Sequence, residues 1–211
     1  MKLFIYEHCP FCLRTRMISG LKNLNMQYQV IMEGDAETPI SMVGKKVVPI
    51  LQKDNGEYLI ESLDIVKYLD ELDKPRFATE SKNNKVDEWI KDTANDIFYL
   101  VVPRFTKGNF KELSTPEARQ AYLDRETQAF GDIEVLIANT EQYLAPVNQQ
   151  LQLLEPIIAE RQGIDIDDFK LLPLLRSLTI VKDIEFGSQT QAYIENLSDK
   201  AQIDLLYDQA I

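Results

Sequence analysis

Both cysteines of this 211-residue chain lie together, as Cys9 and Cys12 of the segment Cys-Pro-Phe-Cys. Two thiols separated by two residues at the start of a helix lie on one side of its first turn, close enough to form a small disulfide ring. Such a bond can be made and broken repeatedly by thiol–disulfide exchange. The spacing therefore predicts redox chemistry at this position.

The flanking residues predict that Cys9 stands at the N-terminus of a helix. Residues 2–6 form a short apolar run typical of a buried strand, and residues 11–24 carry apolar side chains at helical spacing. Pro10 then takes the favoured first helical position. Unpaired N–H groups and the helix dipole favour an anion there, so the pKa of Cys9 is expected to fall below the usual value of about 8.5. Cys12, one turn further in, gains less, so Cys9 is predicted to attack and Cys12 to resolve the mixed disulfide.

Other uses of a Cys-x-x-Cys segment fit this chain less well. A structural zinc site needs four ligands, but only two cysteines and one histidine, His8, are present, so no metal is expected without a carboxylate or a second chain. An iron–sulfur cluster needs four thiolates. A permanent disulfide is not expected because the sequence opens with Met1, Lys2 and a strand and not with a secretory signal, which favours a reducing cytoplasm. A pair of inert thiols on a helix face remains open.

Composition narrows the classes of partner. The net charge is −11, with 23 Lys and Arg against 34 Asp and Glu, which argues against nucleic acid because that binding depends on phosphate neutralisation. Only −2 of this charge falls in residues 1–72, so the N-terminal part can accept an anionic small molecule. No run approaches the roughly 18 apolar residues that span a bilayer, so no membrane association is expected.

The first 72 residues alternate strand and helix signals. Strands are predicted at 2–6, 28–32, 47–51 and 58–60, and helices at 11–24, 40–43 and 62–72, the last capped by Ser62. The helical crossover between the first two strands requires parallel pairing, whereas the Asn55-Gly56 turn requires antiparallel pairing of the last two. The order βαβ, then ββα, predicts an α/β domain with a four-stranded mixed sheet.

Strand signals nearly vanish in the rest of the chain. Residues 73–84 are predicted to be a linker, and residues 85–211 an all-α domain. Helices are expected over 86–102, ending at Pro103, from Pro116 onward, through 131–160 with breaks at Pro146 and Pro156, and over 188–197. The most apolar helix, 169–181, is predicted to be the buried centre of this half.

A βαβ-ββα unit with Cys-Pro-Phe-Cys after its first strand resembles the thioredoxin fold, and a proline in the second motif position resembles the glutaredoxins. Val48-Pro49 corresponds to the cis-proline segment that lies beside the active cysteines in that fold. Glu61-Ser62 matches the acid–serine pair with which glutathione transferases and glutaredoxins hold the γ-glutamyl end of glutathione. The helical second half resembles that of the glutathione transferases.

A closer resemblance is to the glutaredoxin 2 family, the large bacterial glutaredoxins with a glutathione-transferase-like fold. It rests on segments that occur in order along both halves: Cys-Pro-Phe-Cys-Leu-x-x-Arg-Met, residues 35–39, Met42-Val43-Gly44, residues 48–53, Pro103-Arg104-Phe105, Ser114-Thr115-Pro116 and residues 172–176. The resemblance implies a monomer that reduces protein disulfides and glutathionylated proteins through a Cys9–Cys12 disulfide. Glutathione would be the co-substrate, with no tightly bound cofactor.

The same resemblance assigns the glutathione-binding residues. Cys9, Val48, Pro49, Glu61 and Ser62 would hold the tripeptide, with the Val48 backbone pairing with its cysteinyl part, and Pro10, Phe11 and Pro49 would support the cysteines. Ser62 could instead be only an N-cap, and Val48 only a strand residue. Tyr6 and Phe11 are expected to be packing residues, although some glutathione transferases use a tyrosine near the end of the first strand. Four basic residues could bind the glycyl carboxylate of glutathione or could simply be solvated surface charges: Arg14, Arg16, Lys45 and Lys46.

Two other functions are considered. The chain could instead resemble a glutathione transferase or a dehydroascorbate reductase that uses Cys9. In those enzymes the motif Cys-Pro-Phe is followed by a residue other than cysteine, so Cys12 argues against both. A non-catalytic, transferase-like binding scaffold would have no need for a thiol pair at a helix N-terminus.

Overall fold

A four-stranded mixed sheet forms the centre of the N-terminal domain. The computed structural model describes all residues, 1–211, and its strands are β1 (Lys2–Ile5), β2 (Gln27–Val30), β3 (Ile50–Gln52) and β4 (Tyr58–Leu59). They lie in the order β2-β1-β3-β4. β1 pairs in parallel with β2 and antiparallel with β3, and β3 pairs antiparallel with β4. The predicted mixed sheet is confirmed.

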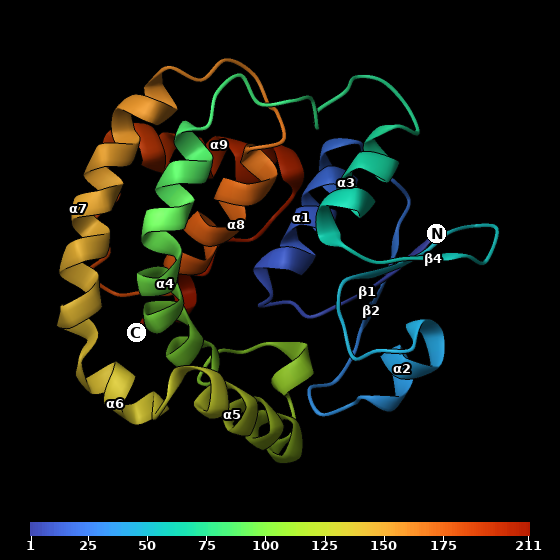
Figure 1. Ribbon diagram of the computed structural model, residues 1–211, viewed down its shortest axis with the longest axis horizontal. Helices are drawn as coiled ribbons and strands as arrows, with labels where there is room; N and C mark the ends of the chain where they lie inside the picture. The colour runs from blue at the N-terminus through green and yellow to red at the C-terminus, as the bar shows by residue number, and fades with distance from the viewer.

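Three helices accompany this sheet: α1 (Pro10–Leu21), α2 (Glu37–Val43) and α3 (Ser62–Asp70). α1 and α3 contact each other on one side of the sheet, and α2 lies on the other side (Figure 1). The prediction that the third strand starts at Val47 was wrong, because β3 begins at Ile50, directly after Pro49. Proline has no N–H to give to a sheet, so the ladder starts after it.

The second domain is helical, as predicted. Its elements are α4 (Lys85–Phe105), η1 (Lys111–Leu113), α5 (Pro116–Phe130), α6 (Ile133–Ala138), α7 (Thr140–Ala159), α8 (Asp168–Leu178), α9 (Ser188–Ala201) and η2 (Tyr207–Gln209). α4 contacts α6, α7 and α8, and α9 contacts α7 and α8. α8 is almost wholly buried, which confirms it as the centre of this half.

The expected helix breaks at prolines were wrong. Pro103 lies inside α4, and Pro146 and Pro156 lie inside α7. An interior proline costs about 3 kcal/mol, but tertiary packing of an apolar face can outweigh such a local preference. In α7 that face is buried, with Leu144, Val147, Leu151, Leu154 and Ile158. The actual interruption follows α5 at Gly131-Asp132, where the Asp132 carboxylate accepts hydrogen bonds from the first amides of α6.

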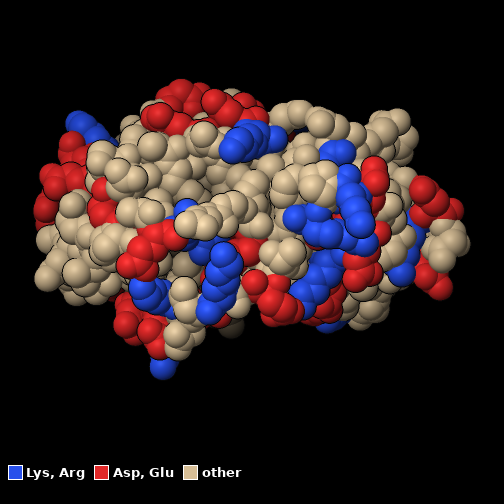
Figure 2. Space-filling view, turned by 90° about the horizontal axis from the view of Figure 1, so that it is seen from above, with Lys and Arg blue, Asp and Glu red and all other residues tan.

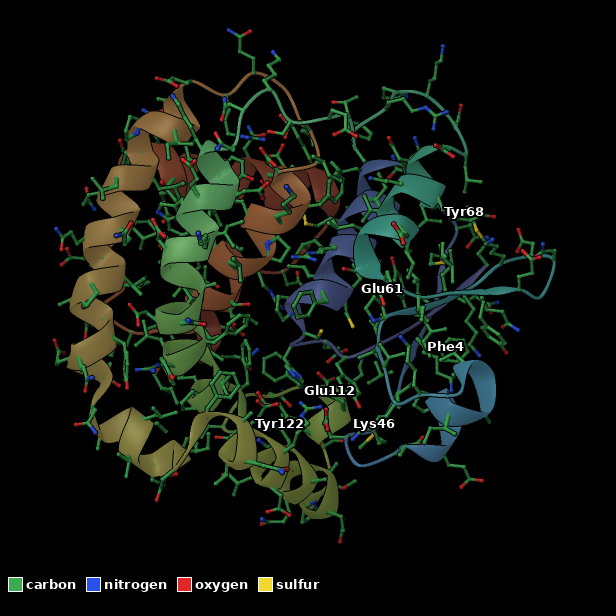
Figure 3. The ribbon with its side chains drawn as sticks, in the orientation of Figure 1. Phe4, Lys46, Glu61, Tyr68, Glu112 and Tyr122 are labelled. Carbon is green, nitrogen blue, oxygen red and sulfur yellow. The ribbon has the colours of Figure 1, made fainter.

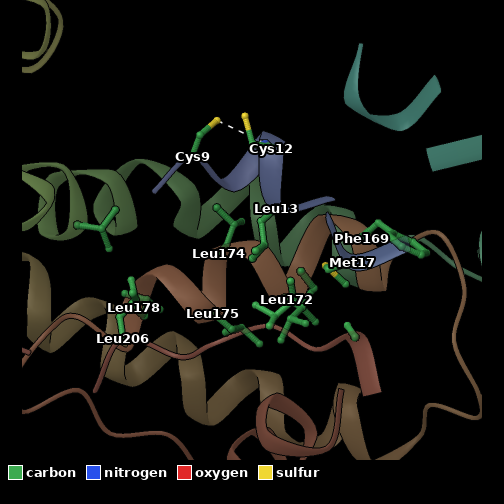
Figure 4. Close-up of a cluster of buried hydrophobic side chains, with 14 of the residues drawn as sticks. Cys9, Cys12, Leu13, Met17, Phe169, Leu172, Leu174, Leu175, Leu178 and Leu206 are labelled. Atoms are coloured by element: carbon green, nitrogen blue, oxygen red, sulfur yellow. Dashed lines mark hydrogen bonds between the residues drawn. The ribbon is translucent and has the colours of Figure 1, made fainter. Parts of the chain in front are cut away.

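α1 joins the two domains because both of its sides are covered. One side contacts α3, and the other contacts α8 and α9. Figure 4 shows Leu13 and Met17 of α1 beside the leucines of α8, with both cysteines at the edge of this buried cluster. The segment with the two cysteines is therefore anchored in the core between the domains.

Surface charge is mixed on the face seen in Figure 2, where lysines and arginines lie among acids without forming one continuous basic area. No helix combines the length and apolar character needed to cross a bilayer.

Candidate functional site

The Cys9 side chain caps α1. Pro10 is the first helical residue, and the Cys9 Sγ accepts a hydrogen bond from the Cys12 amide at 3.5 Å. Both cysteines are free thiols and both are buried. The predicted placement of Cys9 at the helix N-terminus is confirmed, and Figure 4 shows the two sulfur-bearing side chains facing each other.

The surroundings favour Cys9 as the thiolate. Its pKa is lowered to about 7, first by a hydrogen bond from the Cys12 thiol and then by the charge of His8 and by the amides of Cys12 and Phe11. Burial opposes this shift but does not outweigh it. About half of the Cys9 thiols are ionised near neutral pH.

Cys12 has the opposite character. Burial raises the pKa of its thiol well above the usual value, and the hydrogen bond to Cys9 and the charge of Cys9 raise it further. The Tyr6 amide donates to the Cys12 Sγ at 3.4 Å, which offsets only part of this rise. Near neutral pH, Cys9 is therefore the cysteine of the pair that ionises, while Cys12 stays protonated.

Val48 lies next to the cysteines with its backbone unpaired. The Val48-Pro49 peptide bond is cis, as the sequence resemblance implied, and Pro49 is buried. Val48 lies outside every helix and strand, and neither its N–H nor its carbonyl oxygen takes part in a hydrogen bond within the chain. A buried or half-buried backbone rarely leaves both groups unpaired, so an extended ligand can pair with them.

Glu61 and Ser62 lie at the start of α3. Glu61, with φ of 68°, occupies the cap position without a side-chain capping hydrogen bond, and Ser62 is the first helical residue. The prediction that Ser62 is the N-cap was therefore wrong. Its hydroxyl instead accepts a hydrogen bond from Arg14 at 3.2 Å, while Glu61 is exposed, with its carboxylate 3.8 Å from the Lys45 ammonium. The first amides of a helix favour an anion, so this end of α3 is suited to one.

A cavity of about 540 Å³ lies between the two domains and reaches Cys9. On the N-terminal side it is lined by Pro10, Phe11, Lys46 and Val48, and on the helical side by a mostly aromatic wall from α4 and α5: Phe98, Val102, Phe105, Tyr122 and Phe130. Pro49, Glu61 and Ser62 are not part of its lining. In Figure 3, Glu61 lies at the start of α3, away from Tyr122 and Glu112 of the helical domain.

Arg14 connects these two parts of the site. It donates to Ser62, and its guanidinium lies 4.8 Å from the centre of the Phe11 ring. Phe11 is 46% exposed, so the expectation of a packed side chain was wrong, and the ring forms part of the cavity mouth. Arg16 points elsewhere, donating to the Glu7 carbonyl oxygen.

Sequence reasoning missed a buried acid from the helical domain. The Glu112 Oε1 lies 2.6 Å from the His8 Nδ1 and also accepts the His8 backbone N–H at 2.9 Å. His8 precedes Cys9 and lines the cavity with it. No local pattern marked Glu112, which belongs to η1 and lies 104 residues away.

A second buried acid, Glu33, was also missed. Its carboxylate accepts from Arg125 of α5 at 2.8 Å and lies 3.9 Å from the Lys46 ammonium. Burial, and then the charge of Glu33, raise the pKa of the Tyr6 phenol, so Tyr6 stays protonated. Tyr6 thus lines the cavity as a neutral residue. No group of three or more His, Cys, Asp or Glu side chains has the arrangement of a metal site.

Comparison with known protein families divides the chain into two matched segments. Residues 3–77 match the glutathione S-transferase N-terminal domain, and residues 85–210 match the glutaredoxin 2 C-terminal domain. A curated glutaredoxin 2 from Escherichia coli is 40% identical over 215 residues, covering 100% of both chains.

Solved structures give the same grouping. The crystal structure of glutaredoxin 2 from Salmonella typhimurium in complex with glutathione is 39% identical, with a TM-score of 0.96 over 100% of this chain and 98% of that one. A glutathione transferase from Phanerochaete chrysosporium has a TM-score of 0.68 at 14% identity, covering 96% of this chain and 98% of that one. The second likeness concerns the fold alone.

Proposed function

The chain belongs to the glutaredoxin 2 family of glutathione-dependent thiol oxidoreductases, and we propose that Cys9 and Cys12 are its redox pair. The observation that carries this proposal is the Cys9 Sγ at the N-terminus of α1, 3.5 Å from the Cys12 amide and open to the cavity between the domains. The role of the nucleophile falls to Cys9, because its pKa of about 7 leaves a large thiolate fraction at neutral pH.

With a glutathionylated protein, Cys9 alone completes the reduction. The Cys9 thiolate attacks the glutathione sulfur, an S–S bond forms between them, and the protein leaves as its thiolate and takes up a proton. A second glutathione thiolate then attacks the glutathione sulfur of this mixed disulfide. Oxidised glutathione forms and the Cys9 thiolate returns.

With a protein disulfide, Cys12 is also needed. Cys9 forms a mixed disulfide with the substrate, which removes the negative charge and the hydrogen bond that helped to raise the pKa of Cys12. The Cys12 thiol then loses its proton more easily and attacks the Cys9 sulfur, releasing the reduced protein. The resulting Cys9–Cys12 disulfide is reduced by two glutathiones, which become oxidised glutathione.

The proposed glutathione site runs from Cys9 past Val48 to the start of α3. The unpaired N–H and carbonyl groups of Val48 would pair with the cysteinyl residue of the tripeptide, with Pro49 fixing that segment. The free amides of α3 and the Ser62 hydroxyl would hold the γ-glutamyl carboxylate, and Glu61 its ammonium group. The Salmonella relative was crystallised with glutathione, which supports this assignment.

The test is a glutathione-coupled reduction of hydroxyethyl disulfide by wild type, Cys9→Ser and Cys12→Ser. Cys9→Ser is expected to lose activity completely, because no other thiolate faces the cavity. Cys12→Ser should keep the reaction with glutathionylated substrates and lose most of the reaction with protein disulfides. A Cys9→Ser protein that still reduces disulfides would contradict the assignment.

The cavity also favours testing a second activity, conjugation of glutathione to an apolar electrophile, because its wall is mostly aromatic. Chlorodinitrobenzene and dehydroascorbate are suitable substrates. Faster turnover of either one than of hydroxyethyl disulfide would make the chain a transferase or a dehydroascorbate reductase in function. We expect hydroxyethyl disulfide to be turned over faster than either, because Cys12 is the second thiol of a disulfide reductase.

Two finer points belong to the same proposal. We place the reaction in the cytoplasm, where glutathione keeps thiols reduced, and we expect a monomer that acts on disulfide-containing and glutathionylated proteins. Light scattering on the purified protein checks the oligomeric state. Trapping of mixed disulfides by Cys12→Ser in cells would identify the protein substrates.

A further inference from the structure

The buried Glu112, the partner of His8, has no part in the steps described above. The Glu112 side chain is 0% exposed and that of His8 6%, and the imidazole Nδ1 lies 2.6 Å from the carboxylate. The same carboxylate oxygen accepts the His8 backbone N–H. The position of the ring is thus fixed at two points, one residue before Cys9.

The aromatic surroundings hold the ring in place as well. The His8 ring packs edge to face on Tyr122 with a centroid distance of 5.0 Å, and its other aromatic contacts are with Tyr6, Phe105 and Phe110. Residues of both domains therefore enclose the ring. Its free edge is at the cavity that Cys9 also lines.

A buried carboxylate is not needed merely to hold the His8 ring in place. Burying a charge costs several kcal/mol unless a counter-charge compensates for it, and a glutamine amide could orient the imidazole equally well. His8 is the only basic side chain within 4.0 Å of Glu112, and the Glu112 Oε2 has no hydrogen-bond partner. The hydrogen bond and charge of His8 lower the pKa of Glu112 against the effect of burial, so the acid is present as the carboxylate.

We propose that Glu112 is a positioning residue for the nucleophile: its carboxylate holds the His8 ring in place at the edge of the cavity, and the ring in that position stabilises the Cys9 thiolate. The inference rests on the proposed role of Cys9. It gives the helical domain a direct electrostatic part in the chemistry of a thiol that belongs to the other domain.

The other ionisable groups near this pair do not replace it. The groups concerned are Tyr6, Cys12, Glu33, Tyr122, Arg125 and Arg176. The first two and Tyr122 have raised pKa values and stay neutral at pH 7. Glu33 and Arg125 pair with each other, and the Arg176 guanidinium donates to the carbonyl oxygens of Asp204 and Glu7. His8 lowers the pKa of Cys9. The Arg14 guanidinium, which donates to Ser62, also interacts with the charge of Cys9, but it has no contact with Glu112.

The test measures the ionisation of Cys9 without using disulfides or glutathione. In a Cys12→Ser background, the rate of alkylation by iodoacetamide is followed against pH with and without Glu112→Gln. We expect the midpoint to rise by about one pH unit, so that alkylation well below it slows roughly 10-fold. Glu112→Asp keeps the charge at a longer distance and should give a smaller rise.

Asp168→Asn in the same background is the matched control. Asp168 is also a buried acid of the helical domain, but it pairs with Arg161 and Tyr193, far from the cysteines in the sequence and outside the cavity. It should weaken the fold without moving the Cys9 midpoint. An equal midpoint for Glu112→Gln and Asp168→Asn would overturn the proposal, whereas a failure of the redox assignment would appear only in the reductase assay.

A measurement on the wild-type chain keeps the proposal testable if Glu112→Gln does not fold. His8 is the only histidine, so a protein with ¹⁵N-labelled histidine gives one pair of ring nitrogen signals. The Nδ1 nitrogen is expected to carry a proton and to donate it to the Glu112 carboxylate. A ring whose Nδ1 carries no proton would rule the proposal out, because Glu112 would then have no hydrogen bond by which to hold it.

Discussion

At the scale of single residues, the reactivity of Cys9 depends on fixed hydrogen-bond donors. The Cys12 thiol and amide and the Phe11 amide all point at one sulfur atom, and they outweigh a burial that would otherwise suppress ionisation. Because these donors belong to the first turn of α1, they need no rearrangement when the thiolate forms. The same hydrogen bond and the charge of Cys9 raise the pKa of Cys12, so Cys12 is expected to stay protonated until Cys9 has reacted.

Replacing the resolving cysteine should therefore change the attacking one. In wild type, alkylation of Cys9 should rise through pH 7 as the thiolate forms and level off above it. Cys12→Ala removes the largest stabilising hydrogen bond, so its curve should move to higher pH by about one unit. Cys12→Ser keeps a hydroxyl donor and serves as the control, with a smaller move. Ultraviolet absorbance of the thiolate checks both, and identical curves for the two variants would contradict this account.

The Ser62 hydroxyl provides a test of the glutathione site. Ser62→Ala removes one hydrogen-bonding group at the start of α3, worth about 1 kcal/mol, and leaves the cysteines untouched. We expect the KM for glutathione to rise roughly 5-fold while kcat changes little. Ser41→Ala, which changes an exposed serine on α2, is the control. A fall in kcat at constant KM would place Ser62 outside the binding site.

At the scale of elements, α1 performs two tasks. Its N-terminal turn favours the Cys9 thiolate, and its two covered sides hold that turn between α3 on one side and α8 and α9 on the other. The contact with α9 is close because residue 20 is a glycine, and a Cβ at that position would overlap the carbonyl group of Ala201. The small residue lets the backbones of the two domains approach.

Gly20→Ala should therefore loosen the joint between the domains. The added methyl group meets backbone and not a flexible side chain, so we expect the free energy of unfolding to fall by about 3 kcal/mol or more. Gly44→Ala is the comparison, because its Cβ would meet nothing and only the left-handed φ of 76° would cost about 1 kcal/mol. Urea denaturation measures both. Equal decreases in the free energy of unfolding for the two variants would mean that α1 and α9 can move apart at little energetic cost.

At the scale of the whole molecule, buried acid–base pairs cross between the domains around the cavity. Glu33 and His8 belong to the N-terminal domain, and their partners Arg125 and Glu112 belong to the helical one. The acids of both pairs are 0% exposed in their side chains. Each buried acid has its nearest basic partner in the other domain, so the pairs favour one relative placement of the domains.

Arg125→Ala tests this coupling through stability. It leaves the Glu33 carboxylate with only the more distant Lys46, and because Arg125 is itself 40% exposed we expect a loss of about 2 kcal/mol, less than for a fully buried pair. Lys107→Ala is the control, since its pair with Glu134 is exposed and worth no more than about 0.5 kcal/mol. Thermal or urea unfolding compares them. A loss no larger than that of Lys107→Ala would show that solvent already compensates Glu33.

Much of the fold could be read from local patterns. Alternating strand and helix signals and the Asn55-Gly56 turn predicted the mixed sheet, and Pro10 predicted where α1 begins. The errors fell where tertiary packing overrode a local rule. Pro146 and Pro156 remain inside α7 because its apolar face is buried, and Ser62 follows the cap because Glu61 takes a left-handed conformation there.

The division between sequence and tertiary structure follows from the range of the forces. The sequence by itself placed both cysteines at the start of α1 and predicted Cys9 as the nucleophile and Cys12 as its resolving partner, because the geometry of Cys9, Pro10 and Cys12 depends on one helical turn and on hydrogen bonds within it. Only the tertiary structure brought Glu112 to His8 and Arg125 to Glu33, contacts that span 104 and 92 residues. Those contacts form because α1 packs against both domains and so brings distant segments together. No local pattern along the chain indicates which distant acid or base will be buried near Cys9.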